Sequence, residues 1–116
     1  MNSDCVFCKI VSRAIPAPLL YEDEQVVAFR DISPQAPAHL LVIPKQHFVD
    51  LPSLIVAGEE ALAGRLLKVA TQVAREQGLV ESGFRTVINT GEHGGQSVFH
   101  LHVHVLGGRH LAWPPG

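Results

Sequence analysis

The segment from Phe99 to Leu106 alternates histidine with apolar residues, and it constrains this chain more than any other stretch. Side chains of a β-strand point to opposite faces with a period of two. A strand over residues 98–106 therefore places His100, His102 and His104 on one face and the intervening apolar residues on the other. At a rise of roughly 3.3 Å per residue, neighbouring histidines lie about 6–7 Å apart at Cα. The apolar face predicts a core contact, and the opposite face predicts a row of imidazoles.

A row of imidazoles on one strand face has three non-catalytic interpretations beside the catalytic one. Core histidines usually occur singly, and a solvated strand face is built equally well from Thr, Lys or Glu. A zinc site that uses all three histidines is a real alternative. Imidazole is also the side chain best suited to change charge near neutral pH and to act as nucleophile, acid or base. The row therefore favours chemistry, with zinc binding as its rival.

The chain enters this strand from a glycine-rich loop, residues 90–97. Flexible backbone lets N–H groups point at an oxyanion, and Ser97 adds a hydroxyl. A glycine loop alone is a weak signal, because hairpin loops are commonly glycine-rich. A glycine loop that leads directly into a row of imidazoles favours a phosphoryl site, with donors beside a nucleophile aimed at phosphorus.

The remaining patterns predict a single α+β domain over residues 1–116. The apolar spacing of residues 59–77 predicts one long amphipathic helix that is followed by Gly78. We expect a short helix over residues 5–12, and strands over 19–22, 25–30, 39–45, 84–89 and 98–106. Asp23 and Glu24 form a tight turn between the first two strands. The sheet should be antiparallel, with its third strand buried on both faces.

Composition limits the partners and the compartment. Apolar residues make up 47% and charged residues 17%, which argues against a disordered chain. No apolar run approaches the roughly 18 residues of a membrane span, and no secretory signal pattern opens the chain. A net charge of −2 provides no basic field for nucleic acid. We therefore expect a cytoplasmic protein that binds neither nucleic acid nor membranes, while a small anionic ligand is compatible with the sequence.

Cys5 and Cys8 form a Cys-x-x-Cys pair. A secreted chain of this size usually has more cysteines, spread further apart. A reduced thiol pair or half of a metal site is favoured. A redox-active pair is disfavoured, because no thioredoxin-like βαβ pattern surrounds it. Plain buried thiols are the simplest alternative.

Residues 95–106 resemble the signature of the histidine triad family, His-x-His-x-His followed by two apolar residues. The likeness is strongest to the nucleotide-binding phosphoramidase branch, and it extends to residues 29–37, 39–45 and 113–116. The resemblance implies a five-stranded antiparallel sheet with one long and one short helix, and a homodimer that joins two sheets into ten strands. It also implies hydrolysis of nucleoside 5′-phosphoramidates, with purine nucleotides preferred.

The same resemblance implies roles for individual residues. His102 matches the nucleophile, which forms a nucleotidylated histidine that water then cleaves. Asp31 matches the residue that binds the ribose hydroxyls, and His39 matches a buried histidine that supports the triad. The catalytic set comprises His39, Ser97, His100, His102 and His104. The groups matching the α-phosphate site are Asn89, Gly95, Gln96, Ser97 and His104. The base pocket comprises Phe29, Arg30 and Ile32.

The resemblance also includes the cysteine pair, which in many bacterial members joins two histidines at a structural zinc ion. The matching histidines here are His47 and His100. Two other functions stay open beside the phosphoramidase: a dinucleoside polyphosphate hydrolase of the same family, and a nucleotide-binding scaffold with incidental turnover. A purely metal-binding protein is a further alternative. The segment Gly107-Gly108-Arg109 and the terminal Trp-Pro-Pro-Gly favour the phosphoramidase branch.

Overall fold

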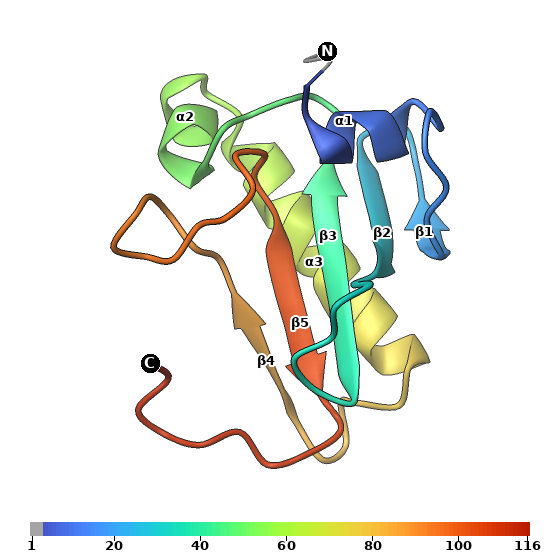
Figure 1. Ribbon diagram of the computed structural model, residues 1–116. Helices are drawn as coiled ribbons and strands as arrows, with labels where there is room; N and C mark the ends of the chain where they lie inside the picture. Colours follow the sequence, from blue (N-terminus) through green and yellow to red (C-terminus); the bar gives the residue numbers. More distant parts are fainter. Residues whose placement is uncertain (1–3) are drawn as a thin grey trace.

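A five-stranded antiparallel sheet with helices on both faces forms the frame of the computed structural model, which describes residues 4–116 (Figure 1). The order across the sheet is β1-β2-β3-β5-β4, so that β5 lies between β3 and β4. The predicted antiparallel five-stranded sheet is confirmed. The strands are β1 (Leu19–Glu22), β2 (Val26–Arg30), β3 (Ala38–Pro44), β4 (Phe84–Val87) and β5 (Val103–Gly107). The helices are α1 (Val6–Val11), α2 (Leu51–Val56) and α3 (Glu60–Glu76).

Apolar side chains of β2 and β3 alternate between two buried clusters, one on each face of the sheet. On one face, Ala28 and Leu40 belong to the larger cluster, which α3 covers. On the other face, Phe29 and Leu41 pack with Phe7 of α1 in a smaller cluster. β3 is buried from its second residue to its last, as predicted for a strand covered on both faces. His39, His102 and His104 lie on the α1 side of this sheet.

The long helix α3 has the predicted amphipathic pattern. Its buried residues are Leu62, Leu66, Val69, Ala70, Val73 and Ala74. It ends at Glu76, and Gly78 just beyond it has a φ of 75°, a left-handed conformation that glycine adopts without steric cost. None of the helices in the described part of the chain is long and apolar enough to cross a membrane.

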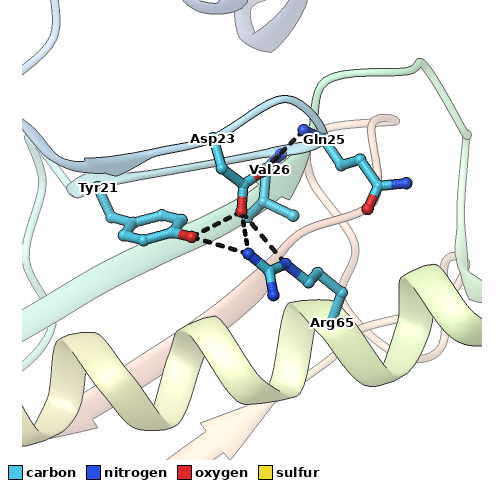
Figure 2. Close-up of polar contacts among 5 residues, drawn as sticks. All are labelled: Tyr21, Asp23, Gln25, Val26 and Arg65. Atoms are coloured by element: carbon cyan, nitrogen blue, oxygen red, sulfur yellow. Dashed lines mark hydrogen bonds and ion pairs between the residues drawn. The ribbon is translucent and has the colours of Figure 1, made fainter.

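A polar network attaches the β1–β2 hairpin to α3 (Figure 2). One carboxylate oxygen of Asp23 accepts hydrogen bonds from the backbone N–H groups of Gln25 and Val26, at 2.7 and 2.8 Å. The other accepts from the Tyr21 hydroxyl at 2.6 Å and from the Arg65 guanidinium at 2.7 Å. Burial raises the pKa of Asp23, but these four donors together hold that pKa well below its ordinary range. Asp23 is therefore an ionised centre of the hairpin turn.

The number of helices and the bounds of the last two strands differ from the sequence predictions. The expected pair of one long and one short helix is wrong in number, because α2 is a second short helix. Asp50 caps it by accepting a hydrogen bond from the backbone N–H of Ser53 at 2.9 Å, and Pro52 lies in its first turn. The fourth strand ends at Val87 instead of Asn89.

The fifth strand begins at Val103, five residues later than predicted. Val42 pairs with Val103 in the β3–β5 ladder, so continuing that register would set Pro44 opposite Leu101. Proline has no N–H to donate, and the N–H of Leu101 instead donates to the carbonyl of Phe48 at 2.7 Å. Residues 98–102 therefore approach the sheet as an irregular segment. The predicted alternation survives, because Leu101, Val103 and Val105 all enter the cluster under α3.

Candidate active site and metal centre

His102 is held in one tautomer by its own backbone segment. It is 5% exposed, and its ring packs edge-on against Phe7 with centroids 5.2 Å apart. Its Nδ1 lies 2.7 Å from the carbonyl oxygen of His100. A carbonyl can only accept, so Nδ1 carries the proton. Burial lowers the pKa of His102 and keeps the ring neutral at neutral pH. Its Nε2 therefore has a lone pair, which is the form of imidazole that acts as a nucleophile.

His39 and His104 form a second hydrogen-bonded pair with the opposite tautomer. The backbone N–H of Gln35 donates to Nδ1 of His39 at 3.0 Å, so that nitrogen carries no proton. The proton of neutral His39 is then on Nε2, which donates to Nδ1 of His104 at 2.8 Å. His104 in turn must carry its own proton on Nε2. Burial lowers the pKa of His39 and lowers that of His104 to about 4, so both rings are neutral at neutral pH.

The Nε2–H of His104 is an orphaned donor. Within residues 4–116, it is the one buried side-chain nitrogen or oxygen without a hydrogen-bond partner. Leaving a buried donor unpaired costs about 1–3 kcal/mol, so such groups in native proteins usually have a functional reason. The His104 ring lies 4.8 Å from the His102 ring, centroid to centroid. The two neighbours thus offer one lone pair and one N–H donor side by side.

A cavity of about 490 Å³ opens beside this pair on the α1 side of the sheet. Seven residues predicted for the site line it: Phe29, Arg30, Asp31, Ile32, His39, Ser97 and His104. His102 does not itself line the cavity. It packs against Phe7 and His104, and both of these residues do.

Sequence reasoning missed much of the cavity wall. Further lining residues come from α1 and the segment after it: Val6, Phe7, Ile10, Ile15, Pro16, Ala17 and Pro18. The sequence signal that could have identified this part of the wall is the spacing of the apolar residues Val6 and Ile10, which lie on one face of the predicted short helix. Asp31, which also lines the cavity, accepts a hydrogen bond from the backbone N–H of Ser33 through Oδ1 at 2.8 Å. Its Oδ2 lies 3.5 Å from Nε2 of His39.

The glycine-rich loop differs from its expected arrangement. The backbone N–H groups of Gly95 and Gln96 donate to the carbonyls of Glu92 and Gly91, each at 3.0 Å. The expectation that these two amides point at a phosphate is therefore wrong for this structure, because the loop closes on itself. The buried side chain of Gln96 is also engaged, because its amide oxygen accepts a hydrogen bond from the backbone N–H of Gly91 at 2.9 Å and its amide nitrogen donates to the carbonyl of Val49 at 2.7 Å. Ser97 remains exposed at the cavity wall, while Asn89 is half-buried and does not line the cavity.

The four predicted metal ligands come together at one point. The sulfur atoms of Cys5 and Cys8 and one nitrogen each of His47 and His100 all lie within 4.8 Å of one another. Nδ1 of His100 is 3.3 Å from the Cys5 sulfur and 3.5 Å from the Cys8 sulfur. Nδ1 of His47 is 3.3 Å from the Cys8 sulfur and 3.1 Å from Nδ1 of His100. Neighbouring ligands of tetrahedral Zn²⁺, bound at about 2.0–2.3 Å, lie roughly 3.3–3.8 Å apart. The donor set and its spacing therefore fit zinc.

The orientation of His100 supports this fit. Its ring is fully buried, and Nε2 donates to the carbonyl of Pro44 at 2.8 Å. That bond leaves Nδ1 unprotonated and aimed at the two thiols, which is the usual arrangement behind a metal-binding histidine. The ring of His100 thus belongs to the cysteine cluster, while its carbonyl oxygen accepts the hydrogen bond from Nδ1 of His102.

A second group, formed by Asp31, His39 and His104, has ligand types that could also hold a metal. Its hydrogen bonds argue against one. Both nitrogens of His39 are occupied, because Nδ1 accepts the Gln35 N–H and Nε2 donates to His104. A metal bound to Nε2 would displace that proton, while Nδ1 still accepts the hydrogen bond from Gln35. The His39 ring would then have no proton on either nitrogen. The two histidine clusters are therefore chemically distinct, with one suited to a metal and the other to hydrogen-bond relay.

The chain is similar to known proteins both in sequence and in structure. The sequence profile of the HIT domain matches residues 12–111. An uncharacterized HIT-like protein of Synechococcus elongatus is 55% identical over 116 residues, covering all of both chains. A 14 kDa zinc-binding protein of Zea mays is 52% identical over 117 residues, covering 99% of this chain and 90% of the maize protein. A HIT family hydrolase from Legionella pneumophila has a TM-score of 0.90 at 48% identity, covering 97% of this chain and 99% of that structure.

Proposed function

Because the chain belongs to the HIT domain family, we propose that it is a hydrolase that cleaves nucleoside 5′-phosphoramidates through a nucleotidylated His102. The observation that carries this proposal is the opposite tautomers of His102 and His104. A lone pair beside a fixed N–H donor suits attack at phosphorus, because one group forms the new bond and the other stabilises the oxygen on which charge accumulates.

The reaction divides into two displacements at phosphorus. Nε2 of His102 attacks the α-phosphorus, the P–N bond breaks, and its electron pair leaves with the amine, which takes up a proton. Water then attacks the phosphorus, the P–Nε2 bond breaks with its electron pair returning to His102, and the water gives up to the solvent one proton, which balances the proton taken up by the amine. The products are the free amine and a nucleoside monophosphate. In both steps Nε2–H of His104 would donate to a phosphoryl oxygen, and the Ser97 hydroxyl would donate beside it.

The cavity wall supports a purine nucleotide as the substrate. Phe29 and Ile32 provide apolar surface for a planar base. Asp31 has a carboxylate at the same cavity, and a carboxylate can accept hydrogen bonds from both hydroxyls of a ribose. Arg30 lines the cavity as well, although its guanidinium donates to Gln77 at 3.0 Å.

The substrate class is tested with purified protein and two matched compounds, adenosine 5′-phosphoramidate and a diadenosine polyphosphate. We expect faster release of AMP from the phosphoramidate, measured as kcat/KM. Preference for the diadenosine compound would instead identify a dinucleoside polyphosphate hydrolase. Tight AMP binding without turnover of either compound would identify a nucleotide-binding scaffold and overturn the proposal.

The same proposal includes a structural zinc ion held by Cys5, Cys8, His47 and His100. Zinc there would cross-link α1 to the segments that follow β3 and precede β5, and it would contribute folding free energy. Elemental analysis of protein purified without chelator should show one zinc ion per chain. A Cys5→Ser, Cys8→Ser double variant is the matched control, and equal zinc in both proteins would refute this site.

We also propose that two chains form a homodimer with a continuous ten-stranded sheet. β4 is an edge strand in the described sheet, and its unpaired backbone groups are available to a second copy. Sedimentation at micromolar concentration should give the mass of a dimer, and a monomer would contradict this arrangement.

A further inference from the structure

The segment directly after β5 lies tightly against the loop that precedes β3. Gly107 pairs with Ala38 at the end of the β3–β5 ladder. Gly108 has a φ of 89°, and a Cβ built on it would lie only 2.8 Å from Cβ of Pro37. Both the backbone conformation and the close approach therefore require glycine at position 108. This contact fixes where the chain beyond β5 crosses the loop of residues 31–37.

Arg109 continues that contact with a hydrogen bond. Its Nη2 donates to the carbonyl of Gln35 at 3.1 Å, and its Nη1 donates to the carbonyl of His110, also at 3.1 Å. One guanidinium thus connects the tail to the loop. Because the group is planar with fixed donor directions, it restricts both the position and the orientation of the Gln35 carbonyl.

Gln35 is the residue whose backbone N–H sets the tautomer of His39. Its side chain has no part in this, since the side-chain amide donates to the carbonyl of Ser33 at 3.0 Å. If the loop shifted and the N–H left Nδ1, His39 could carry its proton on either nitrogen. His39 would then no longer be restricted to donating to His104, and Nε2 of His104 would lose its fixed role as a donor.

We propose that Arg109 is a positioning residue. It keeps the backbone N–H of Gln35 hydrogen-bonded to Nδ1 of His39 and thereby keeps Nε2–H of His104 available to the substrate phosphate. This inference rests on the proposed function for its kinetic consequence. The tautomers themselves are a property of the free protein and do not depend on any substrate.

The decisive experiment is ¹⁵N NMR of histidine-labelled protein without nucleotide, comparing wild type with Arg109→Ala. In wild type we expect an unprotonated Nδ1 and a protonated Nε2 for both His39 and His104. In Arg109→Ala we expect the two signals of each ring to move toward each other as the tautomers mix. Gly108→Ala, which forces the same segment away from Pro37, should cause the same change. Wild-type tautomers in Arg109→Ala would overturn the proposal.

Two control variants separate positioning from general disturbance of the tail or loop. Arg85→Ala removes hydrogen bonds of 3.2 and 2.9 Å to the carbonyls of Leu111 and Ala112, and so loosens the same tail without touching the loop. Gln35→Ala removes the side chain but keeps the backbone N–H. Neither variant should change the His39 signals. A change in Arg85→Ala as large as that in Arg109→Ala would also overturn the proposal.

Kinetics supply the second measurement. Arg109→Ala should lower kcat about 10-fold and leave KM nearly unchanged. This loss of kcat is smaller than the roughly 10²-fold loss that a 1 Å misplacement of a catalytic group can cause. Arg109→Lys should recover little, because an ammonium group lacks the planar pair of donors. If wild type hydrolyses no phosphoramidate, the proposed function fails, while the NMR comparison still decides whether Arg109 sets the tautomers.

Discussion

His102 and His104 are neighbouring imidazoles of opposite tautomer, with ring centroids 4.8 Å apart. Each tautomer is set by a different part of the chain. The carbonyl of His100 accepts a hydrogen bond from Nδ1–H of His102, whereas Nε2–H of His39 donates to Nδ1 of His104. The pair therefore presents an acceptor and a donor without needing a charged histidine.

Removing the Nε2–H donor of His104 should slow the reaction without preventing nucleotide binding. Because His104→Ala takes away one N–H beside the phosphorus, kcat should fall about 10²–10³-fold, the usual cost of losing one preorganised donor. Affinity for AMP, measured by calorimetry, should change far less, since the cavity wall and Asp31 remain. A variant that keeps wild-type kcat would show that Nε2 of His104 does not contact the transition state.

Asp31 should affect KM only for substrates whose sugar has hydroxyl groups. Asp31→Asn keeps Oδ1, which accepts the Ser33 N–H, but it removes the negative charge and one acceptor. For a ribonucleotide substrate we expect KM to rise about 10-fold or more, since a hydrogen bond to a charged group contributes about 1.5–3 kcal/mol. For the 2′,3′-dideoxy compound the wild type and the variant should give equal KM values. An equal effect on both compounds would remove Asp31 from the ribose site.

Much of this arrangement follows from the sequence, and the rest depends on contacts that no pattern reveals. The imidazole row and the apolar face of Leu101 and Val103 follow from a period of two. The helix α2 escaped prediction because it is six residues long and buries only Leu54, which is too little for a helical period. The capping residue Asp50 with Pro52 two positions later was the usable signal.

The details of the site were less predictable for a related reason. Glycine accepts many backbone conformations, so residues 90–97 could not be assigned a direction for the Gly95 and Gln96 amides. The tautomer of His39 depends on a single backbone N–H from Gln35, and every residue except proline has such a group. Only the three-dimensional structure identifies which of these N–H groups points at the ring.

Removal of the proposed zinc ion should loosen α1 and weaken nucleotide binding together. α1 has six residues and is too short to be stable alone. Phe7, stacked edge-on to Phe29 at 5.6 Å, still contributes about 1.5–3 kcal/mol of apolar burial, so α1 should loosen rather than unfold. We expect chelation to speed hydrogen exchange at the amides of α1 and to raise the Kd for AMP, because Val6, Phe7 and Ile10 line the cavity. Unchanged exchange in α1 after complete zinc removal would contradict the cross-link.

Stability should fall in mild acid, in part through His104. Its pKa is about 4 in the fold against about 6.5 in the unfolded chain. Between these values the unfolded chain binds more protons than the fold, so the free energy of unfolding decreases as the pH is lowered from 6.5 toward 4 and is level above 7. Urea unfolding of His104→Asn should show a shallower decrease than wild type over that range. Identical pH dependence in the two proteins would mean that His104 is not buried as a neutral ring.

The most direct measurement is mass spectrometry of wild-type protein quenched within the first turnover of a nucleoside 5′-phosphoramidate. We predict a protein heavier by one nucleoside monophosphate group, with the added mass on His102 after peptide mapping, and no adduct in His102→Ala. An adduct on a different residue, or continued hydrolysis by His102→Ala, would contradict nucleophilic attack by His102.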